Sequence, residues 1–252
     1  MQTIKFPLVT CVIPCYNHEK WISQAIMSIV NQDYPNKRII IINDASTDSS
    51  WDKIKYLLNG KKVLNNSNPL IYHGDIQGIS VLAVNFEKNI GRSEARNYGI
   101  RAGLNDTDLY CFLDSDDYYN EGKISKSVKE WQKHPETIGV VYTDYSTLNI
   151  HNNLLQRQFK EPFDYSRLRQ ECIVNNDSLI SKKAIETCGG YDPDLEVCED
   201  YDLWLRISKK FSIVHIAENL LTVRVGKHSS TDTINKETWE KCYRRVMEKN
   251  AS

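Results

Sequence analysis

The chain has 252 residues, of which 40% are hydrophobic and 26% are charged, and its formal net charge is −1. This length is sufficient for one large core, or for one core with a small subdomain. The balanced charge argues against a nucleic-acid-binding protein, because phosphate-binding surfaces concentrate Lys and Arg.

The chain opens with the pattern of a strand followed by a helix. Residues 8–13 form a near-continuous apolar run that ends at Pro14, as expected for a strand buried on both faces of a parallel sheet. Asn17 can cap a following helix, whose apolar residues recur at helical spacing until Tyr34-Pro35. We therefore predict one β-α unit here.

A second unit follows directly. Residues 39–42 are four isoleucines and predict another buried strand. The polar turn 43–48 leads into a helix for which Gly60 is the expected stop. Because open α/β sheets bind ligands beyond the carboxyl ends of their strands, Asp44 in this turn is a candidate site residue.

The centre of the chain is less regular. Residues 59–77 are polar and read as a long connection before a strand at 81–85. Residues 89–102 combine a glycine turn with a helix that carries two arginines, Arg92 and Arg96. Either arginine could reach a phosphate, hold an acidic turn or lie at the surface, and spacing alone does not decide. Three small residues form a stripe that permits close packing on the sheet: Ala95, Gly99 and Ala102.

Residues 110–117 are the most informative segment, because an apolar strand there ends in spaced carboxylates. Proteins hold Mg²⁺ or Mn²⁺ through carboxylate oxygens, while substrate phosphates and water complete the shell. The segment therefore predicts a site for metal and phosphate, and a solvated turn that caps the next helix is the alternative. A strand ending in Asp-x-Asp also occurs in haloacid-dehalogenase-type phosphatases, where Asp114 would be the nucleophile and Asp116 the acid/base. Tyr118 and the mid-chain position argue against that class.

The remaining patterns concern location. The seven cysteines are scattered and without CxxC spacing, which favours a reducing compartment. No signal peptide and no run of about 18 apolar residues is seen in the sequence, so we expect a cytoplasmic protein. Trp239, Tyr243 and Val246 form the apolar side of a C-terminal amphipathic helix surrounded by basic residues. This helix either docks on the core or makes peripheral contact with anionic lipid at the membrane's inner face.

Taken in order, several blocks resemble the signature of the family 2 glycosyltransferases. The blocks are residues 12–17, 43–48, 89–99, 112–117, 189–192 and 199–206. The resemblance implies an α/β GT-A fold, with a Rossmann-like nucleotide-binding core, a mainly parallel mixed sheet and a smaller acceptor-binding part. It implies a nucleotide-sugar-binding half at 1–120, an acceptor-binding and catalytic half at 121–230, and a C-terminal helix at 231–252.

The resemblance also implies roles for individual residues. Asp44 is expected at the base, commonly uracil, whose imide N–H a carboxylate can accept; a helix cap is its alternative role. Asp116 is the expected metal ligand, joined by His228, while Asp114 contacts ribose or Arg96. The expected contacts of the nucleotide-sugar are Pro14, Tyr16, Asn17, Asp44, Asn89, Arg92, Arg96, Asp114, Ser115 and Arg224.

Catalysis is expected at the start of a late helix. The family pattern places the general base at Asp200, with Glu199 as its competitor. A carboxylate is ionised at neutral pH and needs only to lie within hydrogen-bond reach of the acceptor hydroxyl. Mn²⁺ or Mg²⁺ would neutralise the leaving diphosphate. Capping of the helix N-terminus and compensation of the helix dipole are the structural alternative for both carboxylates.

We therefore predict an inverting hexosyl- or N-acetylhexosaminyltransferase that acts in the assembly of a cell-surface glycan. It would move a sugar from a nucleotide-diphospho-sugar, with UDP as the expected nucleotide, to a hydroxyl of a glycan or lipid-linked acceptor. The phosphatase and a non-catalytic glycan-binding protein are the alternative classes.

Overall fold

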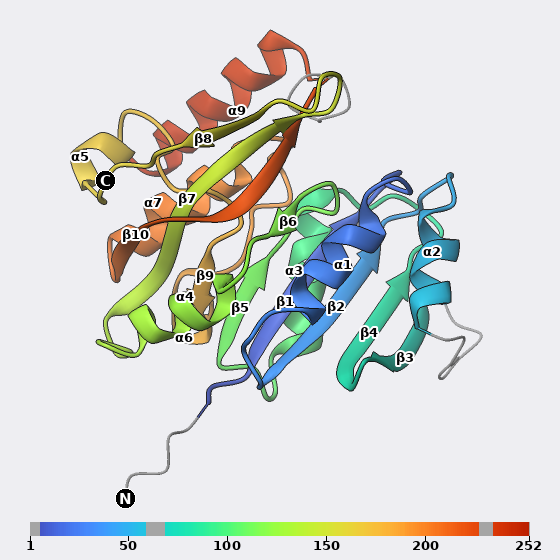
Figure 1. The fold of residues 1–252 in the computed structure, drawn as a ribbon. Coiled ribbons are helices and arrows are strands. Elements are labelled where there is room, and N and C mark those ends of the chain that lie inside the picture. The colour runs from blue at the N-terminus through green and yellow to red at the C-terminus, as the bar shows by residue number, and fades with distance from the viewer. Residues whose placement is uncertain (1–5, 59–68, 227–233, 252) are drawn as a thin grey trace, which may run out of the picture.

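The computed structural model describes residues 6–58, 69–226 and 234–251. Its centre is a ten-stranded mixed sheet with the order β3-β4-β2-β1-β5-β9-β7-β10-β6, and β8 pairs with β7 outside this path. Helices cover both faces of the sheet (Figure 1). This is the α/β architecture that the sequence predicts.

The first half of the sheet is built from parallel strands. Its members are β1 (Val9–Cys15), β2 (Lys37–Asn43), β4 (Ile79–Asn85) and β5 (Leu109–Phe112). The helices of this half are α1 (Ile22–Val30), α2 (Ser50–Leu57) and α3 (Arg92–Gly103). Successive residues of β1 enter opposite cores, because Cys11 and Ile13 pack on one face and Val12 on the other. The apolar run of this strand follows from burial on both faces.

The second half combines long parallel strands with short antiparallel ones. Its strands are β6 (Tyr118–Tyr119), β7 (Ile138–Asn149), β8 (Leu155–Gln158), β9 (Leu179–Ser181) and β10 (Ser212–Val225). Its helices are α4 (Lys123–Trp131), α5 (Tyr165–Leu168), α6 (Lys182–Cys188), α7 (Glu199–Ser208) and α9 (Lys236–Lys249). Strand β9 runs antiparallel between β5 and β7 and joins the two halves into one sheet.

The start of the chain differs from the prediction in two details. Pro14 does not stop the first strand, because it pairs with Ile42 and β1 continues to Cys15. Asn17 does not cap α1, which begins after Trp21 without a side-chain cap. Instead, Asn17 has a positive φ of 55°, and its side chain accepts a hydrogen bond of 2.8 Å from the amide of Thr47. The residue therefore joins the turns that follow β1 and β2.

The predicted connection at 59–77 contains a strand. Strand β3 (Leu70–Ile76) pairs antiparallel with β4 through a turn at Gln77 and Gly78, which both have positive φ. This edge strand is only partly buried, so its sequence lacks the continuous apolar run of the central strands. The expected helix stop, Gly60, lies outside the described residues.

Helix α3 packs on the sheet through small residues, but the prediction was wrong for one residue of the stripe. Ala95 and Gly99 face the sheet, and a Cβ on Gly99 would lie 2.4 Å from Val12 Cγ1. Ala102 is exposed, and Gly103 takes its place on the buried face. The close approach packs α3 against β1, and α3 also contacts β2.

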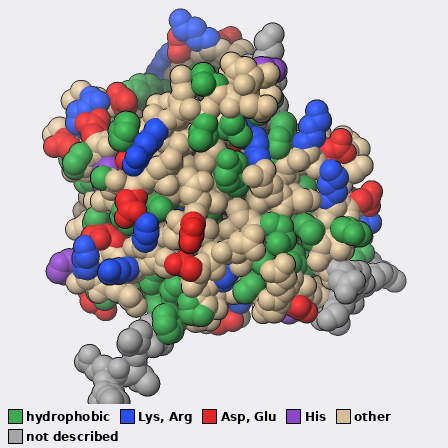
Figure 2. All heavy atoms as spheres, in the orientation of Figure 1, with side chains coloured by type: hydrophobic (Ala, Val, Ile, Leu, Met, Phe, Trp, Pro, Cys, Tyr) green, Lys and Arg blue, Asp and Glu red, His purple; other side chains and the backbone are tan. Residues whose placement is uncertain are grey.

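The C-terminal helix α9 docks on the core through Cys242 and Val246, with Trp239 packed beside them. Tyr243 remains 40% exposed. Lipid contact through the rest of this helix remains a prediction. No helix among residues 6–58, 69–226 and 234–251 combines the length and apolar character needed to span a membrane. Basic and acidic side chains are interspersed across the face drawn in Figure 2.

Candidate functional site

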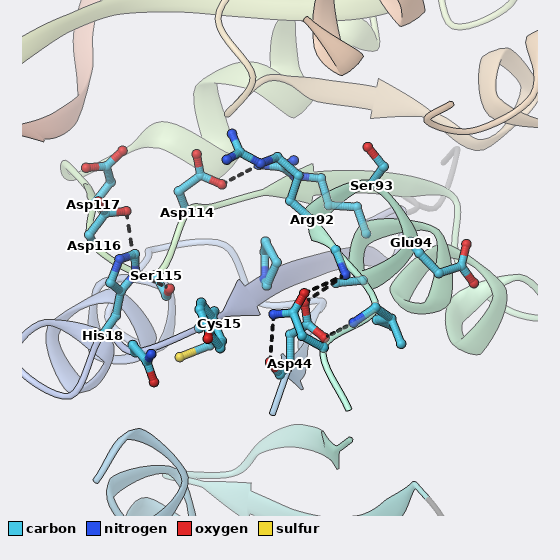
Figure 3. Close-up of a pocket in the computed structure, with 18 of the residues that line it drawn as sticks. Cys15, His18, Asp44, Arg92, Ser93, Glu94, Asp114, Ser115, Asp116 and Asp117 are labelled. Carbon is cyan, nitrogen blue, oxygen red and sulfur yellow. Dashed lines mark hydrogen bonds and ion pairs between the residues drawn. The ribbon is translucent and has the colours of Figure 1, made fainter. Parts of the chain in front are cut away.

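A cavity of about 830 Å³ opens at the carboxyl ends of β1, β2 and β5. All ten residues predicted to contact a nucleotide-sugar line it, and so does Asp116. Figure 3 shows Asp114, Asp116 and Asp117 gathered on one side of the cavity and Asp44 on another. The fold thus brings together turns that lie far apart in the sequence.

Asp44 has a role that neither sequence interpretation described. Its two carboxylate oxygens accept hydrogen bonds from the amides of Ile90 (2.6 Å) and Gly91 (3.1 Å), just before α3. Asn89 donates a hydrogen bond to the Asp44 carbonyl oxygen at 3.1 Å. Burial raises the pKa of Asp44, and the two amide hydrogen bonds oppose this shift. Asp44 therefore holds the loop before α3, whereas Asp48 accepts from the amide of Ser50 at the start of α2.

Arg96 connects the acidic turn, residues 114–117, to the start of α7. Its Nη2 lies 2.5 Å from Asp114 Oδ1, and its Nη1 lies 2.7 Å from Glu199 Oε1. The guanidinium is buried and lies over the ring of Tyr191, 5.4 Å from the centroid. The structure thus pairs Asp114 with Arg96, one of the two partners expected for it.

The electrostatics of Asp114 follow from this pair. Burial by itself would raise the pKa of Asp114, but the charge of Arg96 and its hydrogen bond lower it below the usual value. Arg96 in turn is held in its charged form, because the two carboxylates outweigh the effect of its burial on its pKa. Asp114 therefore stays ionised at neutral pH.

The acidic turn provides donors for a divalent cation. Carboxylate oxygens of Asp114, Asp117 and Asp177 lie within 4.8 Å of one another. Burial and the charge of Asp116 raise the pKa of Asp117, while burial and the charge of Asp114 raise that of Asp177 to about 8. Such crowding of carboxylates is relieved when a cation binds. These hard oxygen donors fit Mg²⁺ or Mn²⁺.

Arg224 holds the acidic turn through hydrogen bonds. Its amide donates to Asp117 Oδ1 at 2.7 Å, and its guanidinium donates to the Asp116 carbonyl and to the side chain of Gln24. The guanidinium also lies over the ring of Tyr118. Arg224 lines the cavity, and its hydrogen bonds fix the turn that carries Asp116.

Glu199 and Asp200 begin helix α7 and have different environments. Glu199 is buried and bound to Arg96. Asp200 is half-buried and accepts only the amide of Tyr201, at 2.8 Å, among the hydrogen bonds of the described residues. Burial, with a further contribution from the charge of Glu199, raises the pKa of Asp200 to about 7. Neither carboxylate caps the helix, because the N-cap is Cys198, which adopts a left-handed conformation. Neither of them lines the cavity directly.

Sequence reasoning missed three parts of this region. His18 lines the cavity beside Ser115, although its place directly after Asn17 was a signal. Asp177 reaches the acidic turn, where it accepts a hydrogen bond from the amide of Asp114, and nothing in its local sequence indicated this. The loop 193–196 forms another wall. The predicted ligand His228 lies outside the described residues.

Comparisons with known proteins agree with this architecture. Residues 10–185 match the model of glycosyl transferase family 2. The chain is 28% identical over 239 residues to the chondroitin synthase of Pasteurella multocida. The aligned region covers 94% of this chain and 22% of that synthase. It is 28% identical over 251 residues to an uncharacterized glycosyltransferase of Rickettsia typhi. The aligned region covers 92% of this chain and 68% of that relative.

Solved structures share the fold at lower identity. TarS 1-349 of S. aureus in complex with UDP-GlcNAc superposes with a TM-score of 0.72 at 16% identity, over 95% of this chain and 65% of that one. The mannosyltransferase PcManGT of Pyrobaculum calidifontis, in complex with GDP-Man and Mn²⁺, superposes with a TM-score of 0.70 at 17% identity. The superposition covers 98% of this chain and 64% of PcManGT. The fold is therefore GT-A, and the chain belongs to glycosyl transferase family 2.

Proposed function

We propose that this glycosyltransferase is an inverting enzyme that transfers a sugar from a UDP-sugar to a hydroxyl of a glycan or lipid-linked acceptor, with a divalent cation bound at the acidic turn. One observation carries the proposal. A single cavity gathers the residues expected at the donor, and the Glu199–Arg96–Asp114 chain of ion pairs connects that cavity to helix α7, which carries Asp200 in its first turn.

UDP is the proposed nucleotide for two reasons. TarS was crystallised with UDP and with UDP-GlcNAc, although PcManGT holds GDP-Man. Each carboxylate oxygen of Asp44 uses one lone pair on a backbone amide and retains another, which can accept the imide N–H of uracil. Tyr16, which is 47% exposed at the cavity, offers an aromatic face to the base.

Asp116, the ligand expected from the family resemblance, and Asp114, which belongs to the group of three carboxylates with Asp117 and Asp177, would hold the cation together with oxygens of the donor diphosphate. When bound, the cation neutralises negative charge on the leaving nucleoside diphosphate. The chain's own part is to keep the carboxylates ionised and oriented. Arg96 does this for Asp114 through charge, and Arg224 does it for the turn through hydrogen bonds.

Asp200 is the proposed general base. Its carboxylate would take the proton of the acceptor hydroxyl as that oxygen bonds to the anomeric carbon, while the bond from this carbon to the diphosphate oxygen breaks. Attack on the face opposite the leaving group inverts the configuration. A base with a pKa of about 7 is well matched to neutral pH, because about half of it is unprotonated and it remains a good proton acceptor. Glu199 is the weaker candidate, since its carboxylate is engaged by Arg96.

The other functional classes lose their support. Family membership places the acidic turn in a glycosyltransferase, and Asp114 is bound by a guanidinium rather than free to act as a phosphatase nucleophile. The acceptor remains a proposal. Two curated relatives are named chondroitin synthase and hyaluronan synthase, so we favour a hydroxyl of a growing polysaccharide.

Calorimetric titration tests the donor site. UDP, dTDP, GDP and ADP are each titrated with Mn²⁺ and with EDTA, on the wild type and on Asp44→Ala and Asp116→Ala. We expect UDP to bind only with Mn²⁺, and both variants to bind it at least about 10-fold more weakly. Leu154→Ala, which changes an exposed side chain away from the cavity, is the matched control. No binding of any nucleoside diphosphate by the wild type would contradict the proposal.

A further inference from the structure

His18 stands at the junction of two turns that form the cavity. It follows the end of β1, and its amide donates a hydrogen bond of 2.9 Å to Ser50 Oγ at the start of α2. Its ring lies edge-on to Trp21, with centroids 5.6 Å apart. The backbone and the ring are thus both fixed, and the imidazole is presented to the acidic turn from a rigid support (Figure 3).

The imidazole contacts the centre of the acidic turn. Nδ1 lies 2.7 Å from Ser115 Oγ and 3.8 Å from Asp116 Oδ1. An unprotonated Nδ1 would direct its lone pair toward a carboxylate, which is unfavourable. A protonated Nδ1 instead donates to Ser115 and points positive charge toward Asp116. The surroundings of His18 therefore favour the tautomer with hydrogen on Nδ1.

We propose that His18 is a positioning residue of the donor site, which sets the orientation of Ser115 and Asp116 and thereby the affinity for a cation bound with the donor diphosphate. This inference rests on the proposed function. Arg224 holds the backbone of Asp116 from one side, and the imidazole of His18 faces the Asp116 carboxylate from the other, with Nδ1 hydrogen-bonded to the neighbouring Ser115 and 3.8 Å from Asp116 Oδ1. Groups that orient metal ligands in this way typically contribute about 10- to 100-fold to metal affinity.

Two substitutions separate this role from a packing role. His18→Ala removes both the ring and the donor. His18→Asn removes the ring but keeps an N–H at the position of Nδ1, because both nitrogens are bonded to Cγ. The measured quantity is the Mn²⁺ concentration that gives half-maximal UDP binding in calorimetry. Thermal unfolding of each variant without metal checks that the fold is retained.

We expect His18→Ala to raise this Mn²⁺ concentration by about 10-fold or more and His18→Asn to restore most of the loss. In an Asp116→Asn background, which already weakens the ligand, His18→Ala should have little further effect. The inference would be overturned if His18→Ala matched the wild type, if His18→Asn lost as much as His18→Ala, or if the loss were equally large in both backgrounds. Absence of Mn²⁺-dependent UDP binding in the wild type would instead overturn the proposed function, and this inference with it.

Discussion

Two carboxylates of this enzyme, Asp114 and Asp200, have opposite electrostatic environments although one arginine lies between their turns. Asp114 is paired with Arg96 at 2.5 Å, which lowers its pKa below the usual value. Asp200 has no ion pair with a cation among the described residues, and burial raises its pKa to about 7 although the charge of Arg96 acts in the opposite direction. One side of the site thus remains negative, which suits the proposed cation, whereas the carboxylate on the other side can take up a proton near neutral pH, which suits the proposed general base.

The pKa values of the two aspartates differ because Arg96 forms an ion pair with Asp114 but not with Asp200. Its two terminal nitrogens bind Asp114 and Glu199, and neither is hydrogen-bonded to Asp200 among the described residues. Glu199 therefore helps to hold Asp114 through Arg96, and its negative charge also contributes to the raised pKa of Asp200.

The largest expected effect is that of Asp200→Asn. The amide cannot take the acceptor proton, so we expect turnover to fall by about 10²- to 10⁴-fold while Mn²⁺-dependent UDP binding is unchanged. UDP released from a UDP-sugar, to water or to an acceptor found by screening, is the readout. Glu199→Gln is the matched control, and it should lose less turnover. If Glu199→Gln were the more damaging change, the base would be Glu199.

Replacing Arg96 by Met should reduce stability strongly. It leaves the buried Glu199 without a counter-charge, and we expect the free energy of unfolding to fall by about 3–5 kcal/mol. Denaturant titration measures this change. The double variant Arg96→Met/Glu199→Gln should recover part of the loss because the unpaired charge is gone. Equal stability of the wild type and Arg96→Met would contradict the importance of this pair.

Replacing Gly99 by Ala should have an intermediate effect. The added Cβ would lie 2.4 Å from Val12 Cγ1, so the helix must shift away from β1, at a cost of about 1–3 kcal/mol. Because α3 carries Arg96, the same change should also weaken UDP binding. Ala102→Ser on the exposed face of α3 is the control and should alter the free energy of unfolding by less than about 0.5 kcal/mol.

A further expected effect is a pH dependence of stability in EDTA. The folded pKa values of Asp200 (about 7) and Asp177 (about 8) lie above the ordinary value of 3.8. Between pH 4 and 8 the folded state therefore holds protons that the unfolded state releases, so these two groups make stability fall as pH rises. Asp200→Asn should reduce this slope. A slope that is the same in the wild type and in Asp200→Asn would show that Asp200 is not shifted.

The parallel strands and the turns of the donor site could be predicted from the sequence for a physical reason. Strands buried on both faces need continuous apolar runs, such as residues 39–42, and polar turns at their ends mark the ligand edge. The half-exposed edge strand β3 has no such run, so its sequence pattern predicts a connection instead of a strand. Helix α3 was predicted, but its buried stripe was misplaced by one residue at Ala102.

The remainder depends on partners that are distant in the sequence. The sequence leaves three roles open for Arg96, and its burial and its ion pair with Asp114 distinguish them; its second partner, Glu199, lies 103 residues away. Asp177 meets Asp114 because the short strand β9 pairs with β5, and three residues are too few for a periodic signal. The raised pKa of Asp200 arises from burial, which a motif does not encode.

The most direct test of this account is a ¹³C NMR titration of the aspartate carboxyl groups in the wild type, with Asp200→Asn and Asp114→Asn to assign the two signals. The account predicts that Asp200 titrates near pH 7, whereas Asp114 titrates below the ordinary aspartate value of 3.8. If both groups titrated near the ordinary value, or if Asp200 were the more acidic of the two, the division of the site into a cation-holding side and a proton-accepting side would be contradicted.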